Sequence, residues 1–200
     1  TYIKSLANIA ATAIEKSLII DEVKQVNRRL DGKVQELNTL FEMSKEFNAV
    51  LNTERLLKLL SFSLLGQVGT SRYFVCLKKE QTMQVVLSRL EKEMSLLCLE
   101  TISRIQQPTF IDSLTKKPYK EYCSMLKEAG VQVLVPLKVQ NEVKGILGVG
   151  ERMRGGEYTQ TDLEFLSSLG NLAMISLENA RLFHDAIEKQ KLLPLIERFS

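Results

Sequence analysis

The sequence is short of the residues that build metal, disulfide and membrane sites. It has no tryptophan, one histidine, four prolines and three cysteines in 200 residues. Charged or amide side chains interrupt the apolar runs well before the roughly 20 residues that a membrane-spanning helix needs, so we expect no direct contact with a membrane. The cysteines are odd in number and lack Cys-x-x-Cys spacing, which argues against a zinc site or a disulfide framework and favours a cytoplasmic location.

The groupings that catalysis requires are also missing. We find no Ser/His/Asp grouping, nucleophile elbow or glycine-rich phosphate loop, so we expect no enzymatic activity, no catalytic residue and no metal ligand. The net charge is only +3 and the basic residues are dispersed, so we expect no nucleic-acid partner. No pattern identifies a cofactor. The composition, 44% hydrophobic and 26% charged, is typical of one globular domain with additional helix.

The first part of the chain predicts long helices. From Ser5 to Ser63 there is no proline and one glycine, which predicts one or two long helices, and apolar residues recur every seven positions in two registers three residues apart, with polar interruptions at Lys33 and Ser44. This repeat is typical of a parallel coiled coil. We therefore expect a homodimer with the contact residues Val23, Val26, Leu30, Leu37, Leu40 and Phe47. The alternative is a single amphipathic helix packed on its own domain, because periods of 3.5 and 3.6 barely differ over this length.

The centre of the chain predicts short strands and helices in alternation. Residues 71–78 and 83–88 are β-rich and separated by a polar turn, so they predict a hairpin. We expect a helix at about 94–105, a short strand at 109–111 and a partly helical segment at 112–129.

A second hairpin follows. Apolar side chains alternate strictly from Val131 to Val139, which is the period of a half-buried strand. Pro136 within this strand predicts an edge position or a bulge. After a turn at 140–142, residues 143–149 predict the returning strand.

The last predicted helix repeats a pattern from the start of the chain. Thr159 is a suitable N-cap for a helix that should run past Glu188 and stop by Pro194. Residues 168–173 (SLGNLA) within it are similar to residues 5–10 (SLANIA). This repeat indicates that the chain opens with the last helix of a preceding copy of the same domain. Chance similarity between two amphipathic helices is the alternative.

Several motifs in combination resemble the GAF domain family. They are a leading helix at 37–60, the strand pair 129–137 and 145–150, the helix start Tyr158-Thr159-x-x-Asp162-Leu163 and the helix sequence Glu178-Asn179-Ala180-Arg181-Leu182. The resemblance spans about residues 36–183. It implies an α+β fold with an antiparallel six-stranded sheet. The helices that lead into and out of the domain would pack together on one sheet face, and a small-ligand pocket would lie on the other.

The repeat and the resemblance divide the chain into four parts. We expect the terminal helix of a preceding similar domain (1–22), a coiled-coil linker (23–36), a GAF-like sensor domain (37–183) and an exit helix (184–200). The exit helix would lead to an output domain outside the chain. Because the chain begins at Thr1 rather than Met, we expect a fragment of a longer, bacterial-type signalling protein.

Departures from two GAF subfamilies restrict the ligand. The nearest counterpart of the cyclic-nucleotide motif is Glu151-Arg152, Tyr158 and Asp162-Leu163, which is incomplete, so we expect no tight binding of cyclic nucleotides. The single histidine, His184, lies beyond the predicted sheet, which argues against attachment of a bilin.

Four residues are candidates for ligand contact. By the resemblance, the segment that covers the pocket contains Tyr119, Tyr122 and Cys123, and Cys76 lies on a predicted strand of the sheet. Aromatic hydroxyls suit a mostly apolar site, so the expected ligand is small and partly apolar. The alternative is that these side chains simply fill the core.

The sequence therefore predicts a regulatory module rather than an enzyme. A small ligand or another signal would shift the packing of the two terminal helices, and the coiled coils would transmit that shift to the output domain. The alternative is a purely structural dimerisation domain whose degenerate pocket is filled by its own side chains.

Overall fold

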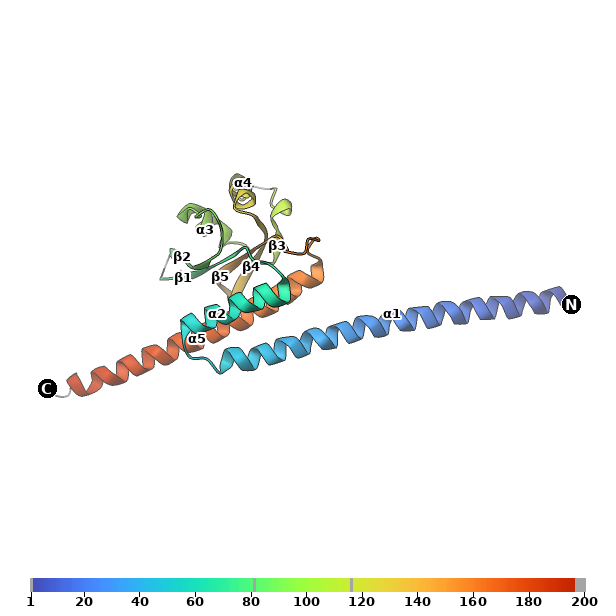
Figure 1. Ribbon diagram of the computed structural model, residues 1–200, viewed down its shortest axis with the longest axis horizontal. Coiled ribbons are helices and arrows are strands. Elements are labelled where there is room, and N and C mark those ends of the chain that lie inside the picture. Colours follow the sequence, from blue (N-terminus) through green and yellow to red (C-terminus); the bar gives the residue numbers. More distant parts are fainter. Residues whose placement is uncertain (1, 81, 116, 197–200) are drawn as a thin grey trace. The chain divides into compact units, whose positions relative to one another are not determined.

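The computed structural model describes residues 2–80, 82–115 and 117–196. It divides into two compact units, Thr1–Met43 and Ser44–Ser200. Helix α1 (Tyr2–Asn48) makes up the described part of the first unit and continues into the second (Figure 1). Among the residues expected at a dimer seam, four in the first unit are between 52% and 65% exposed: Val23, Val26, Leu30 and Leu37. Their exposure leaves an apolar stripe on this helix.

The remaining two seam residues are less accessible. Leu40 is half-buried. Phe47, which belongs to the second unit, is only 2% exposed and is therefore a core residue of this chain.

The sequence left open whether residues 5–63 form one or two long helices, and the structure has two, which divide the leading helix that the resemblance implied at 37–60. Helix α1 ends at Asn48 and α2 spans Thr53–Ser63. Asn52 has extended backbone angles, and its side-chain oxygen accepts a hydrogen bond from the Arg55 N–H at 3.0 Å. An asparagine in this position satisfies a free N–H at the start of a helix, so the chain begins a new helix here. A π-helical turn, Leu64–Val68, follows α2 and ends at Gly69, whose φ is 74°.

The second unit is built on an antiparallel sheet with the order β2-β1-β5-β4-β3. Its strands are β1 (Tyr73–Lys79), β2 (Thr82–Ser88), β3 (Thr109–Phe110), β4 (Val131–Val139) and β5 (Glu142–Gly150). Within the described residues the sheet has five strands rather than the expected six. The stretch between β2 and β3 forms helix α3 (Leu96–Ile102), and a 3-10 turn at Ile111–Ser113 stops β3 after two residues. These local conformations leave little chain for another strand.

The position of Pro136 follows from the short β3. The register places β3 opposite Val133 and Leu134, and Pro136 lies beyond it, on the open edge of β4. Proline is tolerated there because it has no N–H to offer a neighbouring strand. Further along the same strand, the Lys138 N–H donates to the side-chain oxygen of Asn171 at 2.8 Å. A helix side chain thus caps part of the strand edge.

Helices α2 and α5 (Gln160–Ile196) cover one face of the sheet (Figure 1). A Cβ atom at Gly170 would lie 2.6 Å from Leu137 Cδ2, so the absence of a side chain lets α5 lie closely against β4. The helix continues through Pro194 to Ile196, whereas the sequence predicted that it would stop by Pro194. The φ angle of proline is compatible with a helix, and one missing hydrogen bond near the end does not terminate it.

The opposite face of the sheet, called the distal face below, is covered by α3 and by α4 (Lys120–Glu128). No helix in the described ranges combines the length and the hydropathy that crossing a membrane requires.

Candidate functional site

The distal face, where a ligand pocket was expected, is occupied by a dense core. A Cβ atom at Gly148 would lie 1.9 Å from Phe74 Cε1, so the buried Phe74 ring lies directly against the β5 backbone. The buried residues around it come from both sheet and covering helices: Cys76, Met83, Cys98, Leu99, Ile102, Ile105, Ile111, Leu126, Ala129, Val131, Leu134 and Ile146. This packing fills the centre of the face with the chain's own side chains.

Cys76 is part of this core. Its side chain is fully buried, and its thiol donates to the Ile146 carbonyl at 3.6 Å. Burial raises the pKa of the Cys76 thiol to about 12. A neutral, enclosed thiol behaves as a small hydrophobic group rather than as a nucleophile.

The other three candidates lie at the margin of the same core. Tyr119, Tyr122 and Cys123 are half-buried and pack against it. Cys123 Sγ is 3.1 Å from the Leu114 carbonyl and 3.2 Å from the Tyr119 carbonyl. Burial raises the pKa of Cys123, although the nearby Lys127 acts in the opposite direction. The fold therefore gathers all four predicted residues around one core, and their contact with a ligand stays a prediction.

Sequence reasoning missed Cys98 as a member of this group. Cys98 is buried on α3, and burial, with a smaller effect from Cys123, raises its pKa to about 11. Only the folded chain brings the three cysteines to the same face, because they lie on three different elements, β1, α3 and α4.

Apart from this hydrophobic core, a polar cluster connects the end of β5 to the start of α5, and we call it the β5–α5 junction. Arg152 pairs with Asp162 at 2.6 Å, and its guanidinium lies 4.7 Å from the centre of the Tyr158 ring. The Tyr158 hydroxyl donates to the Gly150 carbonyl at 2.9 Å. These residues are the nearest counterpart of the cyclic-nucleotide motif, and here their side chains bond to one another and to the backbone.

Asp162 also caps α5. Its carboxylate accepts from the Thr159 N–H at 2.7 Å and from the Thr159 hydroxyl at 2.8 Å, which is a capping-box arrangement. Partial burial acts to raise the pKa of Asp162, but the hydrogen bonds from Thr159 and Arg152 outweigh it, so the pKa is lowered. The carboxylate is therefore held in its charged form at the positive end of the helix.

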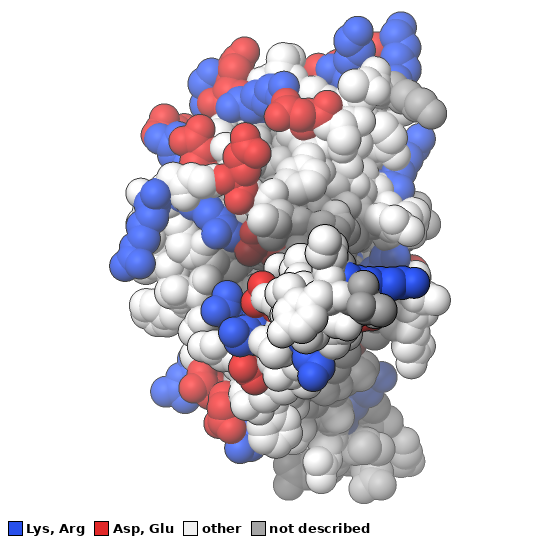
Figure 2. All heavy atoms as spheres, turned by 90° about the vertical axis from the view of Figure 1, so that its right-hand side faces the viewer, with Lys and Arg blue, Asp and Glu red and all other residues white. Residues whose placement is uncertain are grey.

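A metal site is not evident in the part of the chain that the structure describes. Within it, no three His, Cys, Asp or Glu side chains are grouped so that they could hold a metal ion. His184 is exposed on α5 and lies 3.5 Å from Glu188. Basic and acidic side chains are interspersed on the face that Figure 2 shows.

Comparison with known proteins identifies the family. The family model of the GAF domain matches residues 53–179, and the chain therefore belongs to the GAF domain family. This match confirms the family predicted from the sequence motifs. No curated protein matches the chain.

Solved structures share the fold at low sequence identity. Residues 122 to 287 of a methyl-accepting chemotaxis protein have a TM-score of 0.51 and 14% identity, covering 70% of this chain and 98% of that one. A GAF domain/HD domain protein from Geobacter sulfurreducens has a TM-score of 0.52 and 16% identity, with coverage of 68% and 98%. The GAF domain of a phosphoenolpyruvate-protein phosphotransferase from Coxiella burnetii has a TM-score of 0.55 and 17% identity, with coverage of 75% and 96%.

Proposed function

We propose that the chain is a cytoplasmic regulatory module that receives a signal in its GAF domain and passes it through dimeric coiled-coil helices to a C-terminal output domain. The GAF family membership supports a regulatory rather than a catalytic role. The similar structures include a part of a chemotaxis protein, and we carry this signalling context over to the chain as part of the proposal.

The observation that carries the proposal is the continuity of α5. The helix is attached to the sheet at Gly170 and Asn171, and it runs without a break to Ile196. Over 37 residues it spans about 55 Å. A displacement of the sheet relative to the helix would therefore be conveyed along a rigid element.

The outer half of α5 suits a partner helix. Leu182 and Phe183 are 54% and 47% exposed, although both are large and apolar. The exposed apolar residues Val23 to Leu37 on α1 offer a second contact stripe. Isolated helices of this kind are marginal in water, so pairing with a second copy of the chain would stabilise both stripes.

The proposal is tested by changing the phase of the exit helix. Residues 1–189, which end within α5, are fused to a reporter enzyme that is active only as a correctly oriented dimer, and one to seven helix-forming residues are inserted at the joint. Reporter activity should vary with the insert and recover near seven residues, because a coiled coil repeats at that interval. Flexible Gly-Ser inserts of the same lengths serve as the control and should uncouple the reporter. Equal activity with every helical insert would refute transmission through the helix.

A second candidate is a purely structural dimerisation domain. The filled distal face favours it, since Phe74 occupies the centre of that face and Cys76 is enclosed beside it. In this case the signal would not be a ligand bound on the distal face.

Truncation of the two tyrosines separates the candidates. If Tyr119 and Tyr122 only complete the core, Tyr119→Ala and Tyr122→Ala should each lower the free energy of unfolding by about 3 kcal/mol or more, as deleted core aromatics do. If they line a ligand site, the loss should be smaller. Urea denaturation of the two variants measures the difference, and two losses above this size would remove both residues from any ligand site.

A further inference from the structure

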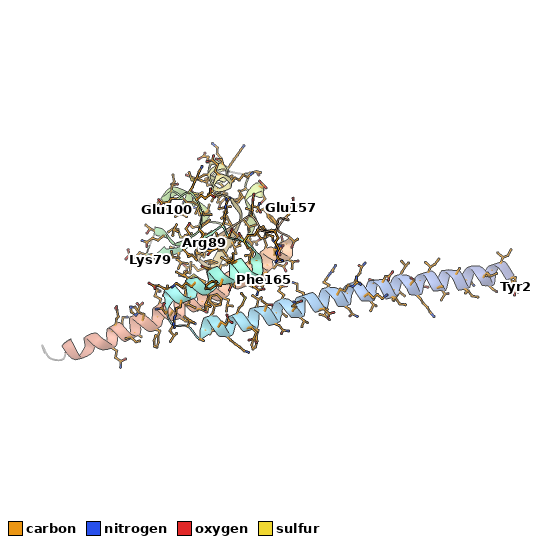
Figure 3. All side chains as sticks on the ribbon, in the orientation of Figure 1. Tyr2, Lys79, Arg89, Glu100, Glu157 and Phe165 are labelled. Atoms are coloured by element: carbon orange, nitrogen blue, oxygen red, sulfur yellow. The ribbon has the colours of Figure 1, made fainter. Side chains whose placement is uncertain are left out.

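A groove of about 720 Å³ lies on the side of the sheet that α2 and α5 cover, away from the distal face. Its walls are formed by α5, the first residue of α2, the end of β1 with Glu80 after it, Val86 of β2 and the start of β5. Figure 3 shows Lys79, one of its lining residues, at the hairpin end of the sheet. The volume is within the range of sites that bind small molecules.

One part of the groove is apolar. Leu77 of β1, Val86 of β2, and Met174 and Leu177 of α5 line it. Leu77 and Val86 are half-buried, so part of each side chain remains accessible, whereas Met174 and Leu177 are each only 5% exposed and contribute less surface. Methionine adapts its shape readily, and a surface of this composition suits a flexible hydrocarbon chain.

The other part of the groove carries an excess of positive charge. Lys144 pairs with Glu142 at 2.7 Å, Arg181 pairs with Glu178 at 2.7 Å, and the charge of Lys78 also acts on Glu142. With Lys79 and Glu80, the lining has four basic and three acidic groups and so one net positive charge. A negatively charged group is therefore favoured beside Lys78 and Lys79.

We propose that this groove binds a medium-chain carboxylate, with its anionic head beside Lys78 and Lys79 and its hydrocarbon chain along Leu77, Val86, Met174 and Leu177. This inference goes beyond the proposed function, because the site would bind its ligand whether or not the module transmits a signal. A bound ligand would touch α2, α5 and the sheet together, which is where the packing of the helices can be altered.

Isothermal titration of the full chain with decanoate tests the proposal. Decanoate should bind with a dissociation constant of roughly 10–100 μM, and octanoate about tenfold more weakly, because two methylene groups leave the apolar wall. Decanol, which has the chain without the charge, should also bind at least fivefold more weakly. These three measurements use the unaltered protein, so they do not depend on the folding of a variant. No heat of binding with decanoate at about 1 mM, or equal affinity for decanol, would overturn the proposal.

Matched variants locate the site. Lys78→Ala combined with Lys79→Ala should weaken decanoate binding at least tenfold, whereas Lys58→Ala, which removes an α2 lysine outside the groove, should leave it unchanged. Val86→Ser should weaken binding several-fold, and Val85→Ser, the adjacent exposed position on β2 outside the lining, should not. Thermal denaturation of each variant verifies that it is folded. Unchanged affinity in the folded double lysine variant, or equal effects at 85 and 86, would place decanoate elsewhere and overturn the proposal.

Discussion

The β5–α5 junction allows a quantitative prediction, because one carboxylate stabilises both a helix start and an ion pair. Asp162→Ala would remove the hydrogen bonds from the Thr159 N–H and hydroxyl and the pair with Arg152. Loss of a helix cap costs about 1 kcal/mol. The side chains of Arg152 and Asp162 are 28% and 30% exposed, so their ion pair adds only about 0.2–1 kcal/mol. We expect Asp162→Ala to lower the free energy of unfolding by about 1–2 kcal/mol in urea denaturation.

The pH dependence of stability gives an independent test of the same residue. The pKa of Asp162 is lowered in the folded protein, so the unfolded chain binds the proton more readily. The stabilisation is therefore complete above the unfolded value, about 3.9, and is lost as the pH falls through the lower folded value. Asp162→Asn should abolish this part of the acid destabilisation, while Asp185→Asn at an exposed position of α5 serves as the control. If Asp162→Ala changes the unfolding free energy by less than about 0.5 kcal/mol, or the Asn variant follows the wild-type pH profile, the junction does not stabilise the fold as argued.

Three further predictions concern the core, the dimer and the thiols. Gly148→Ala should lower the free energy of unfolding by about 1–3 kcal/mol, because its methyl group would overlap the Phe74 ring. Gly32 has open space around it, so Gly32→Ala should be neutral or stabilising. Chemical denaturation compares the two variants. Light scattering at about 100 μM should show the chain as a homodimer. Leu30→Asp combined with Leu37→Asp should make it a monomer with an unchanged sheet domain. A monomeric wild type would contradict the proposed seam. Cys76 should resist iodoacetamide in the native protein and react after unfolding, because its thiol is fully buried and has a pKa of about 12. Mass spectrometry follows the labelling. Rapid labelling of the native protein would show that the distal core opens.

Local patterns in the sequence were enough to predict much of the fold. The strict alternation from Val131 to Val139 predicted β4, and the structure has that strand with the same bounds. The polar turn between two β-rich runs predicted the hairpin of β1 and β2. The motif at Tyr158 to Asp162 predicted the start of the last helix and, with the other motifs, the GAF family. These features depend on side-chain periodicity and on capping between residues close in the chain, which a sequence displays directly.

Other features were decided only when distant segments met. The Phe74 ring lies against Gly148 although the two residues belong to strands far apart in the chain, and this contact fills the face where a ligand pocket was expected. Arg152, Tyr158 and Asp162 looked like an incomplete nucleotide motif, and their structural role emerged from the way that β5 and α5 approach each other. The groove beside Lys79 likewise combines two helices and three strands. Such sites depend on strand register and helix placement, which arise from the packing of the whole domain and are not encoded in any short stretch of residues.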